Sequence, residues 1–232
     1  MNMRLKTTLA TAGLVMSAAG AQAATTLTGT LTVDNAFTAY LSTSAGTLGT
    51  EIASGTNWTT VQNLAAQTLT PGTTYYLQIV GWNYDDAATP GTIQPANPPG
   101  NPDAFIGNFS LNGTGFTFEN GGTTLNTDTT NWQSEVVASP SYTVTWNTPS
   151  GTPVSFGLNG ATPWNNLTGI AGGAAFIWAV DPASDTGESF FETKITPTGV
   201  IPEPATWALT LVGFGALGAA LRGRRGRAMA SA

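Results

Sequence analysis

The sequence contains no cysteine and no histidine. Without cysteine there are no disulfides, so a folded body must be stabilised by the burial of apolar side chains. Without either residue, nucleophilic sites of the Ser-His-Asp and Cys-His kinds are excluded, as are the usual zinc and haem sites. We therefore expect a protein that is not an enzyme and that has no cofactor other than a structural calcium ion.

Cations are also scarce. The chain has 7 Lys and Arg against 13 Asp and Glu, and Lys194 is the one cation between residues 24 and 199. The excess of carboxylates would repel a phosphate backbone, which excludes nucleic acid as a partner. Ion pairs can contribute little to stability here, because most carboxylates have no cation to pair with. Solubility must come from Thr, Asn, Ser and Gly.

Helical periodicity is absent from residues 24–196. Short runs there alternate apolar and polar residues with the period of two typical of β-strands, and Gly, Asn and Pro separate them. Residues 75–82 and 174–180 are apolar on both faces and are expected to form central strands. The pattern predicts an all-β ectodomain, a β-sandwich or jelly roll, over residues 24–196. The alternating runs begin at Leu27, Phe37, Phe105, Tyr142 and Val154.

The first 23 residues have the layout of a secretory signal peptide. Arg4 and Lys6 give a positive start, an apolar stretch follows as far as Gly20, and Ala21-Gln22-Ala23 is a small-x-small cleavage site. The apolar stretch is too short to span a bilayer comfortably. We predict a signal-peptide helix over residues 1–23 and export through the Sec machinery.

The C-terminal end changes character. Residues 197–204 are a proline-containing linker, residues 205–221 are apolar, and residues 222–232 contain four arginines. An apolar helix of this length spans roughly 25 Å, which is at the short end for crossing a bilayer. The positive-inside rule keeps the basic end in the cytoplasm and the body outside. We predict a single transmembrane helix over residues 205–221 with a basic cytoplasmic tail.

The same segment resembles a known sorting signal. In order and spacing it is similar to the PEP-CTERM signal of exopolysaccharide-producing Gram-negative bacteria, although Gly223 and Gly226 interrupt the basic run. The resemblance implies transient anchoring in the inner membrane, cutting by an exosortase at or near Pro-Glu-Pro, and a final place at the cell surface or outside the cell. The residues that carry the resemblance are Pro202, Glu203, Pro204, Trp207, Gly213, Gly215, Arg222, Arg224 and Arg225.

Tryptophans in the body have two interpretations. Their rings either fill a sandwich core or stack on the apolar faces of sugars. Trp82, Trp146 and Trp178 end or interrupt strand runs, and we assign them to the core. Each of the other three has an asparagine beside it, whose amide could bind sugar hydroxyls. The candidate ligand-binding residues are Asn57, Trp58, Asn131, Trp132, Trp164 and Asn165.

Two acidic turns are candidates for a calcium site. Asp34-Asn35 precedes one strand run and Asp85-Asp86 follows another. Calcium binds six to eight oxygens from carboxylates, amides and carbonyls. The same residue types also close turns by bonding to their own backbone, so both interpretations stay open.

The body also resembles bacterial galactose-binding-like jelly rolls. Loose patterns around Asp34-Asn35, Thr73 to Val80 and Ala175 to Trp178 carry this resemblance. Domains of that type often bind carbohydrate and often hold a structural calcium ion.

Together these features predict an exported, non-enzymatic surface or matrix protein that associates with exopolysaccharide and binds carbohydrate. A structural envelope component without a specific ligand is one alternative. A secreted glycoside hydrolase is another, and it would need two carboxylates facing each other across a cleft. Glu119 and Glu135 are candidates by residue type alone.

Overall fold

The computed structural model describes residues 24–84, 92–95, 103–141, 143–179, 186–198 and 211–216. Contacts divide the chain into one compact unit of residues 23–200, hereafter the body, and a second unit that contains the two ends. In the second unit the described residues 211–216 are helical. Among the residues described, no helix has the length and hydropathy needed to cross a membrane. The predicted signal peptide lies outside them.

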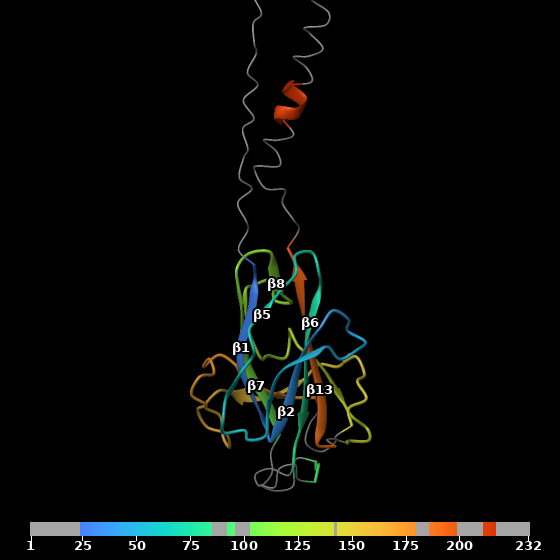
Figure 1. Cartoon of the computed structure of the whole chain (residues 1–232). Helices are drawn as coiled ribbons and strands as arrows, with labels where there is room; N and C mark the ends of the chain where they lie inside the picture. Colours follow the sequence, from blue (N-terminus) through green and yellow to red (C-terminus); the bar gives the residue numbers. More distant parts are fainter. Residues whose placement is uncertain are drawn as a thin grey trace, which may run out of the picture. The chain divides into compact units, whose positions relative to one another are not determined.

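Two antiparallel sheets make up the body (Figure 1). The first has the order β11-β12-β7-β1-β4, with β5 also paired to β1 and β9 to β7. The second has the order β10-β13-β6-β2-β3, with β8 also paired to β13. The all-β prediction is therefore confirmed. The strands are β1 (Thr26–Asp34), β2 (Ala36–Ser42), β3 (Thr50–Gly55), β4 (Gln62–Asn63), β5 (Gln67–Thr68), β6 (Tyr75–Trp82), β7 (Ala104–Asn112), β8 (Phe116–Phe118), β9 (Thr124–Asn126), β10 (Gln133–Val136), β11 (Val154–Leu158), β12 (Ala175–Trp178) and β13 (Glu188–Pro197).

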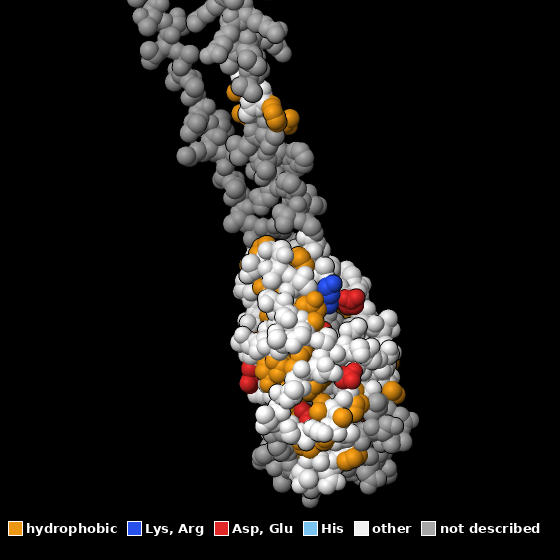
Figure 2. Space-filling view, turned by 90° about the vertical axis from the view of Figure 1, so that its right-hand side faces the viewer, with side chains coloured by type: hydrophobic (Ala, Val, Ile, Leu, Met, Phe, Trp, Pro, Cys, Tyr) orange, Lys and Arg blue, Asp and Glu red, His pale blue; other side chains and the backbone are white. Residues whose placement is uncertain are grey.

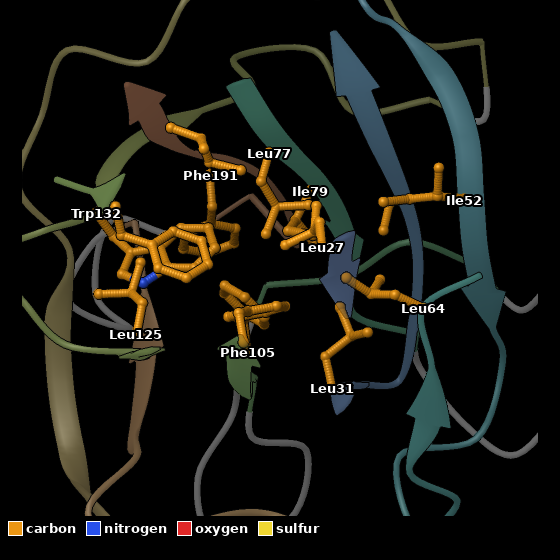
Figure 3. Close-up of a cluster of buried hydrophobic side chains, with 14 of the residues drawn as sticks. Leu27, Leu31, Ile52, Leu64, Leu77, Ile79, Phe105, Leu125, Trp132 and Phe191 are labelled. Carbon is orange, nitrogen blue, oxygen red and sulfur yellow. The ribbon is translucent and has the colours of Figure 1, made fainter. Parts of the chain in front are cut away.

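The main core lies between the inner faces of the two sheets. Strand alternation places Leu27 and Leu31 of β1 opposite Leu77 of β6 and Phe191 of β13. Trp132 joins this cluster, with its ring centroid 5.0 Å from that of Phe105 (Figure 3). Burying each large apolar side chain contributes about 1.5–3 kcal/mol. This burial stabilises a body that has no disulfides.

Apolar clusters also cover the outer faces. A cluster that contains Trp164 and Phe176 covers the first sheet. A cluster that contains Trp82 and Phe190 covers the second. Strand β6 lies between β13 and β2 in its sheet and is covered on both faces. This confirms the central strand predicted for residues 75–82.

The strand predicted to begin at Tyr142 is wrong. Residues 143–150 form no strand, although their alternation correctly marks one buried side. Val144 and Trp146 pack on the cluster that covers the second sheet, and the Trp146 ring lies 4.9 Å from that of Phe190. The indole N–H of Trp146 donates to the carbonyl of Ala45 at 2.7 Å. The segment therefore covers a sheet without pairing to it.

The body's chain enters and leaves at one end of the sandwich (Figure 1). The hydroxyl of Thr25, just before β1, donates to the carbonyl of Thr114 at 2.6 Å. The backbone N–H of Thr198, just after β13, donates to the carbonyl of Gly115 at 2.8 Å. The turn between β7 and β8 thus holds both ends, and β13 includes Pro197, the first residue of the predicted linker.

Two glycines make room for a core ring, which gives a test of the packing. A Cβ on Gly29 would lie 2.5 Å from Cδ1 of Phe109, and one on Gly107 would lie 2.9 Å from Cζ of the same ring. Gly29→Ala should lower the free energy of unfolding by about 1–3 kcal/mol, because overpacking forces the ring or the strand to move. Urea denaturation followed by tryptophan fluorescence would measure the change.

Gly172→Ala is the matched control. Its added Cβ would meet nothing within 4 Å, so its unfolding midpoint should equal that of the wild type. Equal midpoints for Gly29→Ala and Gly172→Ala would contradict the packing described here.

Candidate functional site

The three candidate tryptophans lie at different depths. Trp132 is 2% exposed in the main core, and its indole N–H donates to the carbonyl of Asn126 at 3.2 Å. Trp164 is 5% exposed and stacks on Phe176 with ring centroids 4.6 Å apart. Trp58 is half-buried against the same cluster as Trp164. Trp132 and Trp164 are therefore core residues with no ring face open to a sugar.

The candidate asparagines mainly shape turns. The Asn57 side chain accepts hydrogen bonds from the N–H and the hydroxyl of Thr59. Asn165 has a φ of 59° and donates to the carbonyl of Pro163. Asn131 donates to the carboxylate of Asp128 at 2.8 Å. Of the three, Asn131 lines the pocket described below, and the structure does not bring the six predicted residues together.

Asp34 and Asn35, the described half of the predicted calcium site, form hydrogen bonds within the body. The indole N–H of Trp164 donates to Oδ2 of Asp34 at 2.8 Å, and burial raises the pKa of Asp34 from 3.8 to about 6. Oδ1 of Asn35 accepts the backbone N–H of Tyr84 at 2.6 Å. Both side chains thus fix the corner between β1 and β2. Asp85 and Asp86 lie outside the described residues.

A polar pocket that the sequence analysis missed lies beside β13. It encloses about 180 Å³. Strand β10 pairs with β13 as far as Glu192, and β8 pairs with it from Ile195 onward. The pocket lies where this edge of β13 has neither partner, and we call it the β13 pocket. Its lining residues are Tyr76, Glu119, Thr130, Asn131, Gln133, Glu192, Thr193 and Lys194.

Strand register explains how these residues meet. Glu192 pairs with Gln133 of β10 on one side and with Gln78 of β6 on the other. Two residues further along β13, Lys194 pairs with Tyr76. Alternation puts these side chains on the outer face of the second sheet. The floor is therefore formed by Glu192, Lys194 and Tyr76, with Gln133 at its edge. Gln78 pairs with Glu192 but does not line the pocket.

Glu192 is the most buried acid of the pocket, at 4% exposed. Its Oε2 accepts a hydrogen bond from Nε2 of Gln78 at 3.0 Å. The Gln78 amide also donates to the carbonyls of Ser44 and Thr47, and its oxygen accepts the N–H of Gly49. Burial raises the pKa of Glu192 from 4.5 to about 6, against the lowering effect of the Gln78 hydrogen bond. Gln78 therefore holds this carboxylate in a fixed position.

Lys194 supplies the opposite charge at the exposed side of the pocket. It is the one cation among the described residues. Figure 2 shows this cation, in blue, beside an acidic side chain on the surface of the body. The pocket thus presents charges of both signs and several uncharged polar groups in a small space.

Little in the sequence indicates this pocket. Charged Glu192 and Lys194 alternate with Phe191, Thr193 and Ile195 in β13, which is a local signal for an outward-facing pair. Their meeting with Glu119 and Gln133 depends on which strands pair with β13. Pairing over such separations leaves no local pattern.

Strand β13 carries another buried carboxylate, that of Glu188. Oε2 of Glu188 accepts the backbone N–H of Ser141 at 2.7 Å. Burial raises the pKa of Glu188 from 4.5 to about 7, against the lowering effect of its hydrogen bonds from Ser141 and Trp82. Asp34, Glu188 and Glu192 thus all take hydrogen bonds from uncharged donors.

The raised pKa values predict a body that is more stable in mild acid. The folded state binds protons more readily than the unfolded chain, so the stabilisation is complete below pH 4 and is lost as pH rises through 6 to 7. Unfolding free energy should fall by more than about 2 kcal/mol from pH 5 to pH 8, since one pKa unit corresponds to about 1.4 kcal/mol. Urea titrations at the two pH values would measure it.

Glu188→Gln removes the acid whose pKa is raised furthest. This variant should show a flatter dependence of stability on pH than the wild type. A wild-type body that is most stable at pH 8 would contradict the assignment.

Comparison with known proteins bears on the C-terminal tail. A family model described as the PEP-CTERM protein-sorting motif matches residues 200–225. No curated protein and no solved structure matches the chain. Within the matched range Gly213 and Gly215 lie in the described helical segment, and the other predicted sorting residues lie outside the described residues. The match confirms the predicted sorting signal: the chain is an exported, transiently membrane-anchored protein with a PEP-CTERM motif, and exosortase is its processing partner.

Proposed function

We propose that the processed protein is a non-enzymatic component of the cell surface or extracellular matrix that binds the exopolysaccharide of its own cell. The β13 pocket is the observation that carries this proposal. It gathers a phenol ring, two amides, two carboxylates and hydroxyls around about 180 Å³. Aromatic rings provide apolar surface beside a polar group, and amides and carboxylates hydrogen-bond to hydroxyls. These are the groups that a sugar surface requires.

The sorting motif supports the same proposal, because it indicates where the protein is delivered. It matches residues 200–225, directly after the body. A protein delivered through the membrane in this way arrives where polysaccharide is exported. The body contributes no positive surface for anionic polymers, since Lys194 is its one cation in the sequence. The partner that fits is therefore a polysaccharide with little negative charge.

A structural component without a ligand is the first alternative. The burial of Trp132 and Trp164 favours it, because two of the three predicted sugar platforms lie within the fold. The β13 pocket was not part of that prediction, and it offers a separate place for a ligand.

A glycoside hydrolase is the second alternative. Glu119 and Glu192 line one pocket, and a carboxyl with a pKa of about 6 suits a general acid. Glu135, proposed from residue type, does not line it. A hydrolase must hold sugar on both sides of the scissile bond, yet the pocket is smaller than the roughly 300 Å³ at which sites for larger ligands begin. Binding without cleavage therefore fits the dimensions better.

Co-sedimentation of the full-length protein with the producer's purified exopolysaccharide tests the proposal. We expect the protein to pellet with the polymer and to release no reducing ends from it. A protein that stays in the supernatant would favour the ligand-free structural role. Release of reducing ends that Glu192→Gln abolishes would favour the hydrolase.

The sorting motif makes its own prediction about processing. Replacing Pro202, Glu203 and Pro204 together with alanine should leave the chain uncut, so a tail-specific antibody should detect it in the inner-membrane fraction. Wild type should appear there as a short-lived precursor. Pro71→Ala, in an exposed turn of the body, is the control and should be processed normally. Normal processing of the triple variant would place the cut elsewhere.

A further inference from the structure

The β13 pocket contains a carboxylate whose hydrogen bonding is incomplete. Glu192 uses Oε2 to accept the Gln78 amide, and within the described part of the chain no other hydrogen bond to this carboxylate is found. An ionised carboxylate only accepts hydrogen bonds and has room for about four. Glu192 is therefore fixed in place, almost wholly buried, and still able to accept donors from a ligand.

The surrounding groups restrict which donors fit. Glu119 and Glu192 outnumber Lys194, so the pocket would repel a carboxylated or sulfated sugar. Gln133 offers both an amide donor and a carbonyl acceptor at the pocket wall. An uncharged ring with neighbouring hydroxyls satisfies all of these groups, since each hydroxyl both donates and accepts.

Size points to the same ligand. The enclosed volume of about 180 Å³ is below the range of about 300–1,000 Å³ typical of sites for larger organic ligands. A single sugar ring of a longer chain can enter while its neighbours extend over the open side. Tyr76, paired beside Lys194 on the floor, supplies the aromatic surface.

We propose that the β13 pocket binds one sugar ring that carries no negative charge, that the ionised Glu192 carboxylate is its main hydrogen-bond acceptor, and that acidification releases it. This inference rests on the proposed function and adds the binding residue, the sugar class and a pH dependence. Gln78 acts as a positioning residue, because it reaches the ligand only through Glu192.

The pH dependence follows from the burial of Glu192. Its pKa is raised to about 6, so the carboxyl is largely neutral at pH 5 and ionised at pH 7.5. Hydrogen bonds to charged groups are stronger than those to neutral ones. The other ionisable groups that face the pocket are Tyr76 from β6, Glu119 after β8 and Lys194 from β13 itself. A Glu119→Gln variant separates the effect of the second acid.

NMR titration of the isotope-labelled full-length protein in detergent tests the inference. The probes are the methyl glycosides of glucose, galactose and mannose, with glucuronate and glucosamine as charged counterparts. We expect a neutral glycoside or glucosamine to shift the side-chain amide signals of Gln133 and Asn131, with weaker or no shifts from glucuronate. Affinity should fall about tenfold from pH 7.5 to pH 5, which corresponds to the loss of one charge-assisted hydrogen bond.

Variants of the pocket residues test whether Glu192 causes the pH dependence of binding. Glu192→Gln should bind about tenfold more weakly at pH 7.5 and should lose the pH dependence, while Glu119→Gln should keep it. Gln133→Ala, at an exposed position, should bind more weakly at both pH values without affecting folding. Glu51→Gln, an exposed acid of β3 outside the pocket, is the control and should match the wild type.

Three results would overturn the inference. The first is a neutral glycoside that binds Glu192→Gln with wild-type affinity and the same pH dependence. The second is a set of shifts caused by calcium chloride and by none of the sugars. The third is wild-type co-sedimentation with exopolysaccharide by both Glu192→Gln and Gln133→Ala, which would reject the pocket while leaving the proposed function intact.

Discussion

Burial of apolar side chains between two sheets is the interaction on which this body depends, because the chain has no cysteine and hardly any cations. Trp132, Phe105 and Phe191 lie at the centre of this packing. The shortage of cations also decides how carboxylates enter the interior. Of the four acids buried in the described part of the chain, three take a hydrogen bond from an uncharged donor: Trp164 for Asp34, Ser141 for Glu188 and Gln78 for Glu192. These bonds join residues 130, 47 and 114 positions apart in the sequence, so they connect distant segments in the way that ion pairs or disulfides do in other domains.

The same shortage shapes the candidate site. A buried carboxylate beside an arginine would be neutralised within the protein and would offer little to a ligand. Glu192 instead accepts one hydrogen bond from the amide of Gln78. Its carboxylate lines a polar pocket, where it can accept further hydrogen bonds. The cost is a pKa raised by desolvation. The proposed binding and its proposed sensitivity to acid therefore share one physical origin, the burial of an acid without a counterion.

Much of the fold could be predicted from local patterns, and much of the site could not. Alternation from Leu27 to Val33 and the doubly apolar run at residues 75–82 identified β1 and β6, because a strand covered on one face or on both has a local pattern of apolar residues. The sorting motif was also readable, since it is a contiguous segment. Alternation from Tyr142 onward misled, because it records burial on one side and says nothing about backbone pairing. The depth of Trp132 depends on Phe105 and Phe109, and the β13 pocket depends on which strands flank β13. Neither the depth of Trp132 nor the position of the pocket can be predicted from the residues next to them in the sequence.

The final strand has a mechanical consequence. The body's chain leaves through β13, which lies inside its sheet and pairs with β6 at eight positions from Glu188 to Ile195. When the protein is tethered by its C-terminal end, drag from flowing water or a stretched matrix pulls β13 along its own axis. Such a load shears all the inter-strand hydrogen bonds at once, whereas an edge strand pulled sideways would open them one after another. The strand that leads to the sorting motif is thus arranged to withstand tension.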